Sequence, residues 1–277
     1  MIVGIDAGNY RVKVCGPQGL DIFSSTLGEY RERRIKNTPG KDDMIFEFEG
    51  RKGFAGSLAD AESEFGGSLM GDSKAHEDAK LRILLALHRY SQTTNQFQII
   101  VGQPISKHTE EEKKRIKDML KGSHEITVND KTKVILISHV EVAAEGGASF
   151  WSKPKDGLVR IIDVGSATVN CASLLNKRYV DRDSFTLPFG LNTVVSSDLS
   201  ALARGIVTHT TKKWNNSDKG YLVGGAAEKL IPYIQQYYPN MEVLKPIYES
   251  VCGDPTFANA IGFYKIGCSI YGKVNQK

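Results

Sequence analysis

Two segments of the chain, residues 2–14 and 158–170, share one pattern of apolar and polar positions. In each, a run rich in β-branched residues ends in Asp-x-Gly, a few small or polar residues follow, and a second apolar run begins. β-Branched residues favour strands, and the glycine favours a tight turn between them. We therefore expect two β-hairpins with short polar tips. Because they start more than half the chain apart, they predict two domains of related design and not a solenoid of short repeats.

Strand-like and helix-like patterns alternate through the rest of the chain. Short apolar or alternating runs predict strands at 45–49, 97–101, 134–137 and 221–223. Helical spacing or a run of small residues predicts helices at 74–90, 109–120, 141–148 and 226–238, the last interrupted by Pro232. Asp254 and Pro255 are typical of a helix start, and this helix should continue through Ile266. Strands and helices mixed in this way predict the α/β class.

Composition narrows the class of protein. The chain has 277 residues, 40% of them hydrophobic, and a formal net charge of +4, which is too mild to indicate binding to nucleic acid or to a membrane surface. No apolar run approaches the roughly 20 residues that a membrane-spanning helix needs. The first residues lack the basic start of a secretion signal. The four cysteines are far apart, so neither a zinc site nor a disulfide framework is expected, and a reducing cytoplasm fits best.

The two hairpin tips carry the first candidate chemistry. A glycine-bearing tip exposes several backbone N–H groups at once, and such a set of donors can bind phosphate oxygens. Asp6 and Asp163 stand beside the two tips, where each could hold a hydrated Mg²⁺ that bridges to the phosphates. Lys13, on the strand that leaves the first tip, could reach back to the β- or γ-phosphate. Two facing tips would hold a nucleoside triphosphate and its metal between the domains.

Two acids are candidates for positioning the attacking water. Glu141 is predicted to stand where a strand gives way to a helix of small residues, a place where α/β proteins present groups to a cleft. A carboxylate there could orient water for attack on the terminal phosphate. Glu145, one helical turn further on, is the rival candidate. Gly224 and Gly225 follow a predicted strand and start a helix, so their N–H groups could face the α-phosphate and sugar.

The order of these motifs resembles that of one superfamily, which includes actins, heat-shock chaperone ATPases and sugar kinases. The resemblance rests on the two Asp-x-Gly tips and on segments 141–146, 222–226 and 258–262. Within the superfamily, segments 54–59 and 102–104 are similar to the bacterial plasmid-segregation actins of the ParM/StbA-like branch. Only 30 residues separate Gly190 from Tyr221, where most actin-like proteins carry a whole small subdomain (IIB). This shortening resembles the AlfA-like plasmid actins.

The resemblance implies an actin-like ATPase fold with two related domains around a central nucleotide cleft, subdomain IIB being missing or minimal. Domain I would comprise residues 1–152 and the C-terminal helix at 256–277, and domain II residues 153–255. Asp6 and Asp163 would face Mg²⁺ through water, and Glu141, with Glu145 as the fallback, would be the catalytic acid. The nucleotide-contacting residues would come from both tips and two later glycine turns: Gly8, Asn9, Tyr10, Lys13, Gly165, Ser166, Ala167, Thr168, Gly190, Gly224, Gly225 and Ala226.

The resemblance also implies a function. Members of this branch form filaments of one protein that assemble with ATP, disassemble after hydrolysis, and move plasmids through a small adaptor bound to centromere DNA. Direct contact with nucleic acid is not expected. Two alternatives stay open: a small-molecule kinase of the same superfamily, which would need an extra base for its acceptor, and a nucleotide-binding scaffold without turnover. The sequence does not separate ATP from GTP.

Overall fold

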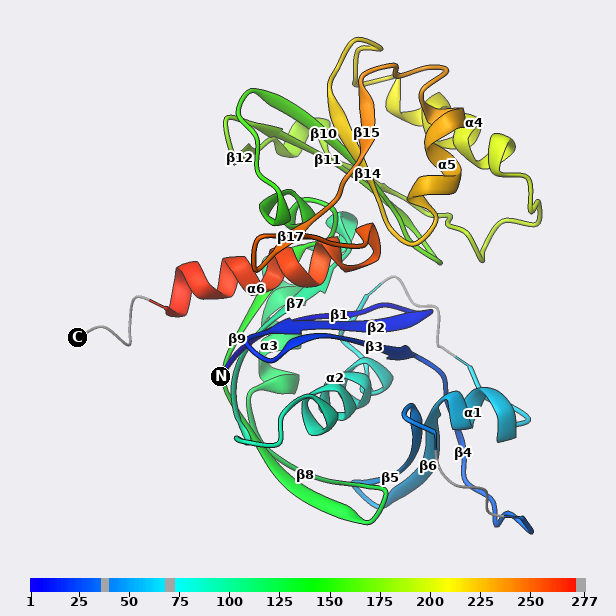
Figure 1. Ribbon diagram of the computed structural model, residues 1–277, viewed down its shortest axis with the longest axis vertical. Helices are drawn as coiled ribbons and strands as arrows, with labels where there is room; N and C mark the ends of the chain where they lie inside the picture. Colours follow the sequence, from blue (N-terminus) through cyan, green and yellow to red (C-terminus); the bar gives the residue numbers. More distant parts are fainter. Residues whose placement is uncertain (36–39, 68–72, 273–277) are drawn as a thin grey trace.

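The computed structural model describes residues 1–35, 40–67 and 73–272, and its chain forms two lobes, each built around one β-sheet (Figure 1). In the described residues the sheet of the first lobe has nine strands in the order β3-β2-β1-β7-β9-β8-β5-β6-β4. These strands are β1 (Ile2–Ala7), β2 (Arg11–Gly16), β3 (Gly19–Ser24), β4 (Leu27–Glu29), β5 (Asp43–Phe48), β6 (Arg51–Gly56), β7 (Gln96–Gln103), β8 (Gly122–Val128) and β9 (Lys131–Ala144).

The sheet of the second lobe runs in the order β12-β11-β10-β14-β15, with β13 paired to β11. Its strands are β10 (Leu158–Val164), β11 (Val169–Leu175), β12 (Arg178–Tyr179), β13 (Phe185–Leu187), β14 (Gly220–Val223) and β15 (Met241–Val243). Each sheet has an antiparallel hairpin, β1–β2 or β10–β11, whose first strand pairs in parallel with a later strand, β7 or β14. Both predicted hairpins are therefore confirmed, and the two lobes share one design.

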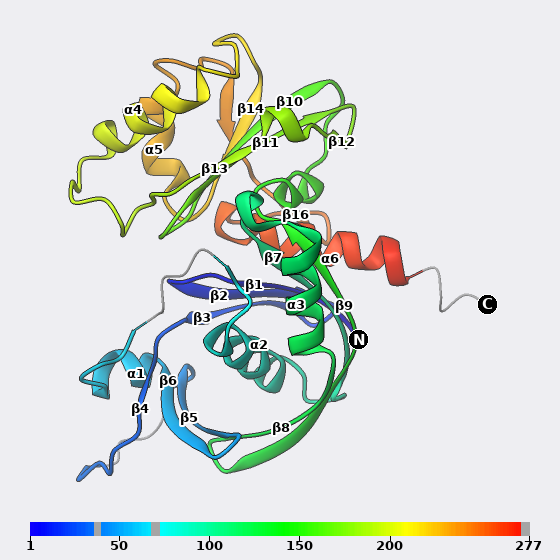
Figure 2. The same cartoon turned by 180° about the vertical axis from the view of Figure 1, so that it is seen from behind.

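Helices pack on the sheets and bury the apolar faces of the strands. In the first lobe the helices are α1 (Ser57–Glu62), α2 (Glu77–Tyr90) and α3 (Glu110–Leu120), with short 3₁₀ turns at Ile105–Lys107 and Ala148–Ser152. The second lobe has α4 (Leu199–Thr210), α5 (Ala227–Ile234) and a 3₁₀ turn at Asp181–Asp183. α2 lies inside the curve of the first sheet, and α4 and α5 lie together on one side of the second (Figures 1 and 2).

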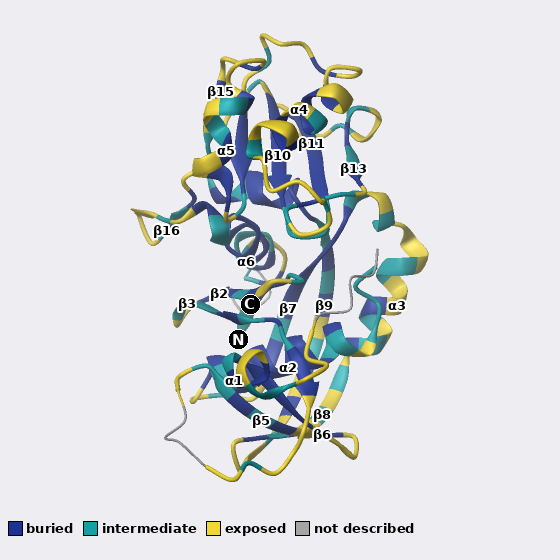
Figure 3. Ribbon diagram, turned by 90° about the vertical axis from the view of Figure 1, so that its right-hand side faces the viewer, coloured by how far each residue is buried: buried dark blue, intermediate teal, exposed yellow. Residues whose placement is uncertain are grey.

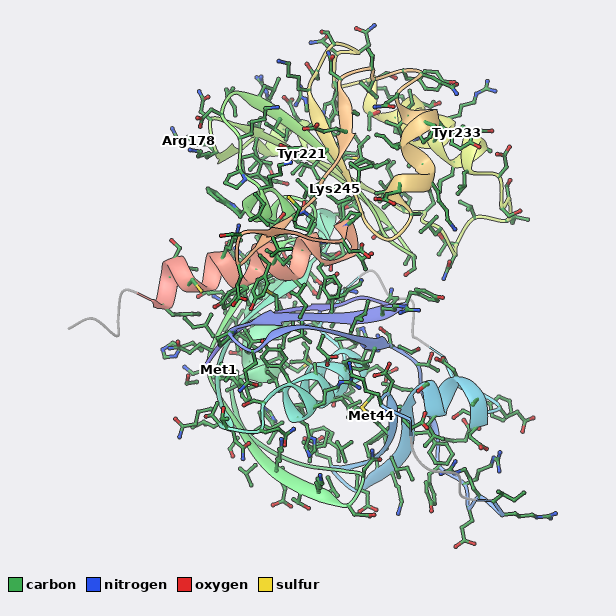
Figure 4. The ribbon with its side chains drawn as sticks, viewed as in Figure 1. Met1, Met44, Arg178, Tyr221, Tyr233 and Lys245 are labelled. Carbon is green, nitrogen blue, oxygen red and sulfur yellow. The ribbon has the colours of Figure 1, made fainter. Side chains whose placement is uncertain are left out.

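The core of each lobe lies between its sheet and these helices. β-Strands buried on both faces run through the middle of each lobe, whereas the outer helix faces are exposed (Figure 3). Met44 on β5 belongs to the core of the first lobe, and Tyr221 on β14 is buried in the second (Figure 4). None of the helices in the described ranges is long and apolar enough to cross a membrane.

Three predicted elements differ from the structure. The helix predicted at 141–148 is wrong, because β9 continues to Ala144 in parallel pairing with β7, and a turn and a 3₁₀ helix follow. The helix predicted at 226–238 is shorter, since α5 ends at Ile234. The strand predicted at 134–137 is only the middle of β9. Small residues in 141–148 favoured a helix locally, but hydrogen bonding to a neighbouring buried strand outweighs that preference.

The stretch from Gly190 to β14, all of it described, holds α4 and turns but no strand. This confirms that the small subdomain expected there in most actin-like proteins is reduced to one helix. The second lobe thus consists of a sheet with two helices on one side (Figure 2).

The end of the chain returns to the first lobe. After β15 come a small hairpin, β16 (Ile247–Tyr248) and β17 (Val251–Cys252), a 3₁₀ turn (Pro255–Phe257) and α6 (Ala258–Tyr271). As predicted, Asp254 caps this start and accepts a hydrogen bond from Thr256 N–H at 2.7 Å. α6 packs against β1, β7 and the 3₁₀ turn at Ala148–Ser152. The proposed domain boundaries, 1–152 with 256–277 and 153–255, stay a prediction, and residues 273–277 lie outside the described residues.

Candidate nucleotide site

A cleft of about 770 Å³ lies between the two lobes, and both hairpin tips line it. The first tip contributes Gly8, Asn9 and Tyr10, and the second contributes residues 165–168. The carboxylates beside the tips, Asp6 and Asp163, line the same cleft and are each only 7% exposed. The sequence-predicted tips thus face a shared space, which is the arrangement a clamped polyphosphate requires.

The first tip is held by lysines. Lys13 pairs with Asp6 across the β1–β2 hairpin, and its Nζ lies 3.2 Å from Asp6 Oδ2. Lys74, which precedes α2, donates from Nζ to the carbonyl of Ala7 at 3.1 Å and also lines the cleft. The ammonium group of Lys13 beside Asp6 offsets the free-energy cost of burying that carboxylate. Lys13 and Lys74 therefore give the first side of the cleft a positive character suited to phosphate.

The second tip is braced by the chain that follows β13. Leu191 N–H donates to the carbonyl of Gly165 at 3.0 Å, and Asn192 N–H donates to that of Ser166 at 2.8 Å. Gly190 lies directly beside the tip, donating its N–H to Thr193 Oγ1 at 2.7 Å, but is not among the residues that line the cleft. Because the carbonyls of Gly165 and Ser166 both accept hydrogen bonds from this following chain, the backbone conformation of the second tip is stabilised by the protein itself.

Asp163, the metal-facing candidate of the second lobe, has a raised pKa. Burial raises its pKa to about 6, the hydrogen bond from Asn259 opposes the rise, and the negative charge of Asp6 adds to it. Asn259 Nδ2 donates to Asp163 Oδ2 at 2.9 Å. Because Asp163 is buried near the like charge of Asp6, a cation bound in the cleft would stabilise its ionised form.

Glu145 is brought to the cleft by the turn that ends β9. Its backbone N–H donates to the carbonyl of Gln103 at 3.0 Å, and Asn170 Nδ2 donates to its Oε2 at 3.2 Å. Burial raises the pKa of Glu145, Lys74 opposes the rise, and Asp6 and Asp163 add to it. An 8%-exposed carboxyl beside the two hairpin tips could accept a proton from water, which is the chemistry a general base needs.

Glu141 is not in the cleft. It lies on β9 opposite Ile100 of β7, and its side chain is 40% exposed on the face toward α3. There Lys117 Nζ lies 2.7 Å from Glu141 Oε2. The strand-to-helix junction expected at Glu141 does not exist, since β9 continues to Ala144. The preferred choice between the two acids is thus not supported by the structure, and the fallback, Glu145, has the expected surroundings.

The far end of the cleft lies between β14 and α5. Gly224, Gly225 and Ala226 line it there, as the glycine turn predicted, and Lys229 of α5 joins them. Among the cleft residues that sequence reasoning missed are Lys74, Lys229 and Asn259. Asn259 lies inside the 258–262 segment that carried the family resemblance, and this was a signal available from the sequence. The sequence around Lys74, just before α2, and around Lys229, in α5, carries no comparable signal.

The residues present fit a hydrated Mg²⁺. Two carboxylates from opposite lobes face one cleft, and Mg²⁺ characteristically keeps several waters while using one or two carboxylates together with phosphate oxygens. In the described part of the chain no group of three or more His, Cys, Asp or Glu is arranged to hold a metal ion by itself. The metal would therefore arrive with the nucleotide and not in a protein-only cage.

The two lobes, their matching sheets and the cleft between them together define a protein with the actin-like fold. The family model of the N-terminal domain of actin-like proteins matches residues 4–147, and the chain belongs to that family. No curated protein matches by sequence.

Solved structures extend the likeness to the whole chain. An AlfA filament bound to AMPPNP is 19% identical, with 99% of this chain and 97% of that one covered and a TM-score of 0.73. A 15-stranded ParM filament from Clostridium botulinum is also 19% identical, with coverage of 97% and 99% and a TM-score of 0.78. Ta0583, an archaeal actin homologue in complex with ADP, is 18% identical, with coverage of 95% and 98% and a TM-score of 0.74. At these identities the likeness establishes the actin-like fold.

Proposed function

We propose that the protein binds ATP and Mg²⁺ between its lobes, hydrolyses the ATP, and assembles with copies of itself into filaments that segregate plasmid DNA. The observation that carries the proposal is the meeting of Asp6, Asp163 and Glu145 in one interlobe cleft beside both hairpin tips. The adenine nucleotides in the AMPPNP and ADP complexes of two structural neighbours favour ATP, and GTP remains the alternative.

Each group has a role that its surroundings support. The backbone N–H groups of residues 8–10 and 165–168 would hold the β- and γ-phosphates, with Lys13 as a point charge. Asp6 and Asp163 would hold the water shell of Mg²⁺, whose charge would offset that of the phosphates. Glu145 would accept the proton of a water aimed at the terminal phosphate. Gly224, Gly225 and Ala226 would face the α-phosphate and sugar.

Self-assembly is supported by the structural neighbours, since the AlfA and ParM structures are both those of filaments. We extend this to the present chain: nucleotide binding between the lobes would favour assembly of the filament. A small DNA-binding adaptor on plasmid centromere DNA would link filament and cargo, so the protein itself would make no direct contact with DNA and would work in the cytoplasm.

Two variants test the enzymatic part. Glu145→Gln keeps the size of the side chain but removes the proton acceptor, and we expect phosphate release to fall by about 10²–10⁴-fold with ATP affinity unchanged within threefold. Glu141→Gln is the matched control: it makes the same change on the outer face of β9, where Lys117 is its partner, and should release phosphate at the wild-type rate. A loss in Glu141→Gln with none in Glu145→Gln would contradict the assignment.

Sedimentation decides between the proposed function and its alternatives. Wild-type protein should pellet with ATP and Mg²⁺ and return to the supernatant as phosphate is released without any added acceptor. ADP formation that depends on an acceptor alcohol, with the phosphoryl group transferred to that alcohol and not released as free phosphate, would instead indicate a kinase. Pelleting with no phosphate release at all would indicate a nucleotide-binding scaffold. Negative-stain micrographs of the pellet would separate filaments from disordered aggregate.

A further inference from the structure

One asparagine joins three parts of the molecule at the back of the cleft. Asn259, in the first turn of α6, is 8% exposed. Its Nδ2 donates to Asp163 Oδ2 at 2.9 Å, and its Oδ1 accepts from Gly146 N–H at 3.1 Å. Asp163 is the last residue but one of β10 in the second lobe, and Gly146 follows Glu145 in the first. The side chain therefore contacts both lobes and the helix that returns between them.

Only one orientation of this amide satisfies both partners. A backbone N–H can only donate, so the group that faces Gly146 must be the oxygen. The ionised carboxylate of Asp163 can only accept, so the group that faces it must be the nitrogen. Asn259 is the residue type that offers one acceptor and one donor at this spacing. The network thus determines the amide orientation by itself.

The turn at Gly146 is packed closely against the second lobe. Its φ is +74°, and a Cβ placed there would lie 3.2 Å from Asn170 Cβ and 3.3 Å from Asp163 Cβ. Gly146 is thus held close to Asp163, and Asn259 bonds both of them. A rotation of one lobe against the other would lengthen at least one of the two hydrogen bonds. The two bonds together therefore favour the mutual arrangement of the lobes that the structure has.

We propose that Asn259 is a positioning residue that holds Asp163 and the Glu145–Gly146 turn in the one mutual arrangement in which both can act on the same polyphosphate. The nitrogen of Asn259 occupies Asp163 Oδ2, and this leaves Oδ1 for the water shell of the metal. Removal of the donor frees the carboxylate to rotate and the lobes to separate. The consequence for catalysis rests on the proposed function, whereas the consequence for the lobes does not.

Asn259→Asp is the sharpest test of this role. The new side chain keeps the size and can still accept from Gly146 N–H, but it places an acceptor against Asp163 in a buried site. We expect the Mg²⁺ concentration for half-maximal phosphate release to rise about tenfold and kcat to fall about 10–100-fold, as for other groups that orient metal-facing carboxylates. ATP binding measured in EDTA should stay within threefold of wild type, which a loss of the fold would not allow.

The matched control is Asn176→Asp. Asn176 Oδ1 accepts from Gly157 N–H at 3.1 Å in an exposed turn of the second lobe, and an aspartate there can make the same bond. This variant should keep the wild-type Mg²⁺ dependence and kcat. Asn259→Ser removes both bonds without adding a charge, and it replaces Asn259→Asp if the aspartate prevents folding. The Mg²⁺ concentration for half-maximal phosphate release should rise in Asn259→Ser as well.

A second readout needs no nucleotide. Spin labels at Ser123→Cys on β8 and Gln236→Cys after α5, in a background with Cys252 and Cys268 replaced by serine, report the distance between the lobes. The nucleotide-free wild type should give one narrow distance distribution, and Asn259→Asp a broad one. If wild-type protein neither binds nor hydrolyses ATP, the proposed function fails while this arm still decides the inference. An unchanged distribution together with unchanged Mg²⁺ dependence would overturn the role of Asn259.

Discussion

The junction between α6 and the first lobe makes a quantitative prediction for Gly262→Ala. A Cβ at Gly262 would lie 2.0 Å from the carbonyl oxygen of Ala148 and 2.7 Å from its carbon, where ordinary contacts begin at 3.4 Å. The atoms in the way are backbone, so they cannot move aside as a flexible side chain would. α6 must then shift away from the 3₁₀ turn at Ala148–Ser152, and the shift also displaces Asn259.

The expected magnitude combines two opposing effects. Overpacking a core costs about 1–3 kcal/mol, and backbone contact points to the upper end of that range. Alanine gains about 1 kcal/mol over glycine in a helix interior. The net expectation is a free energy of unfolding about 2 kcal/mol lower, which in a chain of this size lowers Tm by roughly 4–8 °C.

Gly205→Ala in α4 is the matched control, because it makes the same change in a helix with room for it. The nearest atoms to a Cβ at Gly205 are Phe189 ring carbons at 3.7 Å and 3.9 Å, an ordinary contact. We expect its free energy of unfolding to rise by about 0.5–1 kcal/mol.

Urea unfolding measures both variants. It can be followed by circular dichroism and by the fluorescence of the two tryptophans, Trp151 in the turn beside α6 and Trp214 in the second lobe. The reasoning predicts a lower urea midpoint for Gly262→Ala and a higher one for Gly205→Ala. Equal or opposite shifts would show that the close approach of α6 to Ala148 does not constrain the fold.

Two further predictions concern charge. Lys13→Met removes the cation 3.2 Å from Asp6 and should weaken ATP binding about 10–100-fold, because a hydrogen bond to a charged group contributes that much. Lys245→Met, outside the cleft, should leave the ATP affinity unchanged. Equal ATP affinities of the two variants in calorimetry would refute the phosphate-facing role of Lys13. Burial lowers the pKa of His88, although its hydrogen bond to the carbonyl of Lys131 opposes this. The unfolded chain therefore binds the proton first, and the stability that His88 contributes is lost as pH falls below about 6.5. In urea titrations, the stability difference between wild type and His88→Gln should shrink from pH 8 to pH 5; a constant difference would contradict it.

The local sequence pattern was enough to predict the two hairpins and the glycine turn that line the cleft. The β-branched apolar runs before and after Asp6 and Asp163 and the glycine two residues later predicted both hairpins, and the glycine turn at Gly224 predicted the far end of the cleft. These features depend on neighbours in sequence, because a hairpin tip is closed by residues only a few positions apart. The short gap after Gly190 likewise predicted the reduced second lobe.

The choice between the two acids shows where local pattern fails. Residues 141–148 are small and compatible with a helix, but β7 offers a strand to pair with, and β9 continues through Glu141. That pairing turns Glu141 outward toward Lys117 and carries Glu145 to the turn at the cleft. Pairing with a distant strand is a tertiary event that a window of neighbouring residues does not contain.

The sequence by itself determined that the chain has two Asp-x-Gly hairpins on an α/β framework with one subdomain reduced. Only the tertiary structure decided which carboxylate enters the cleft, that Lys74 and Lys229 line it, and that Asn259 bonds both lobes. The physical reason is the range of the interactions. Strand propensity and turn chemistry act between residues that are neighbours in sequence, whereas burial and hydrogen bonding in the cleft join residues as far apart in sequence as Gly146 and Asn259.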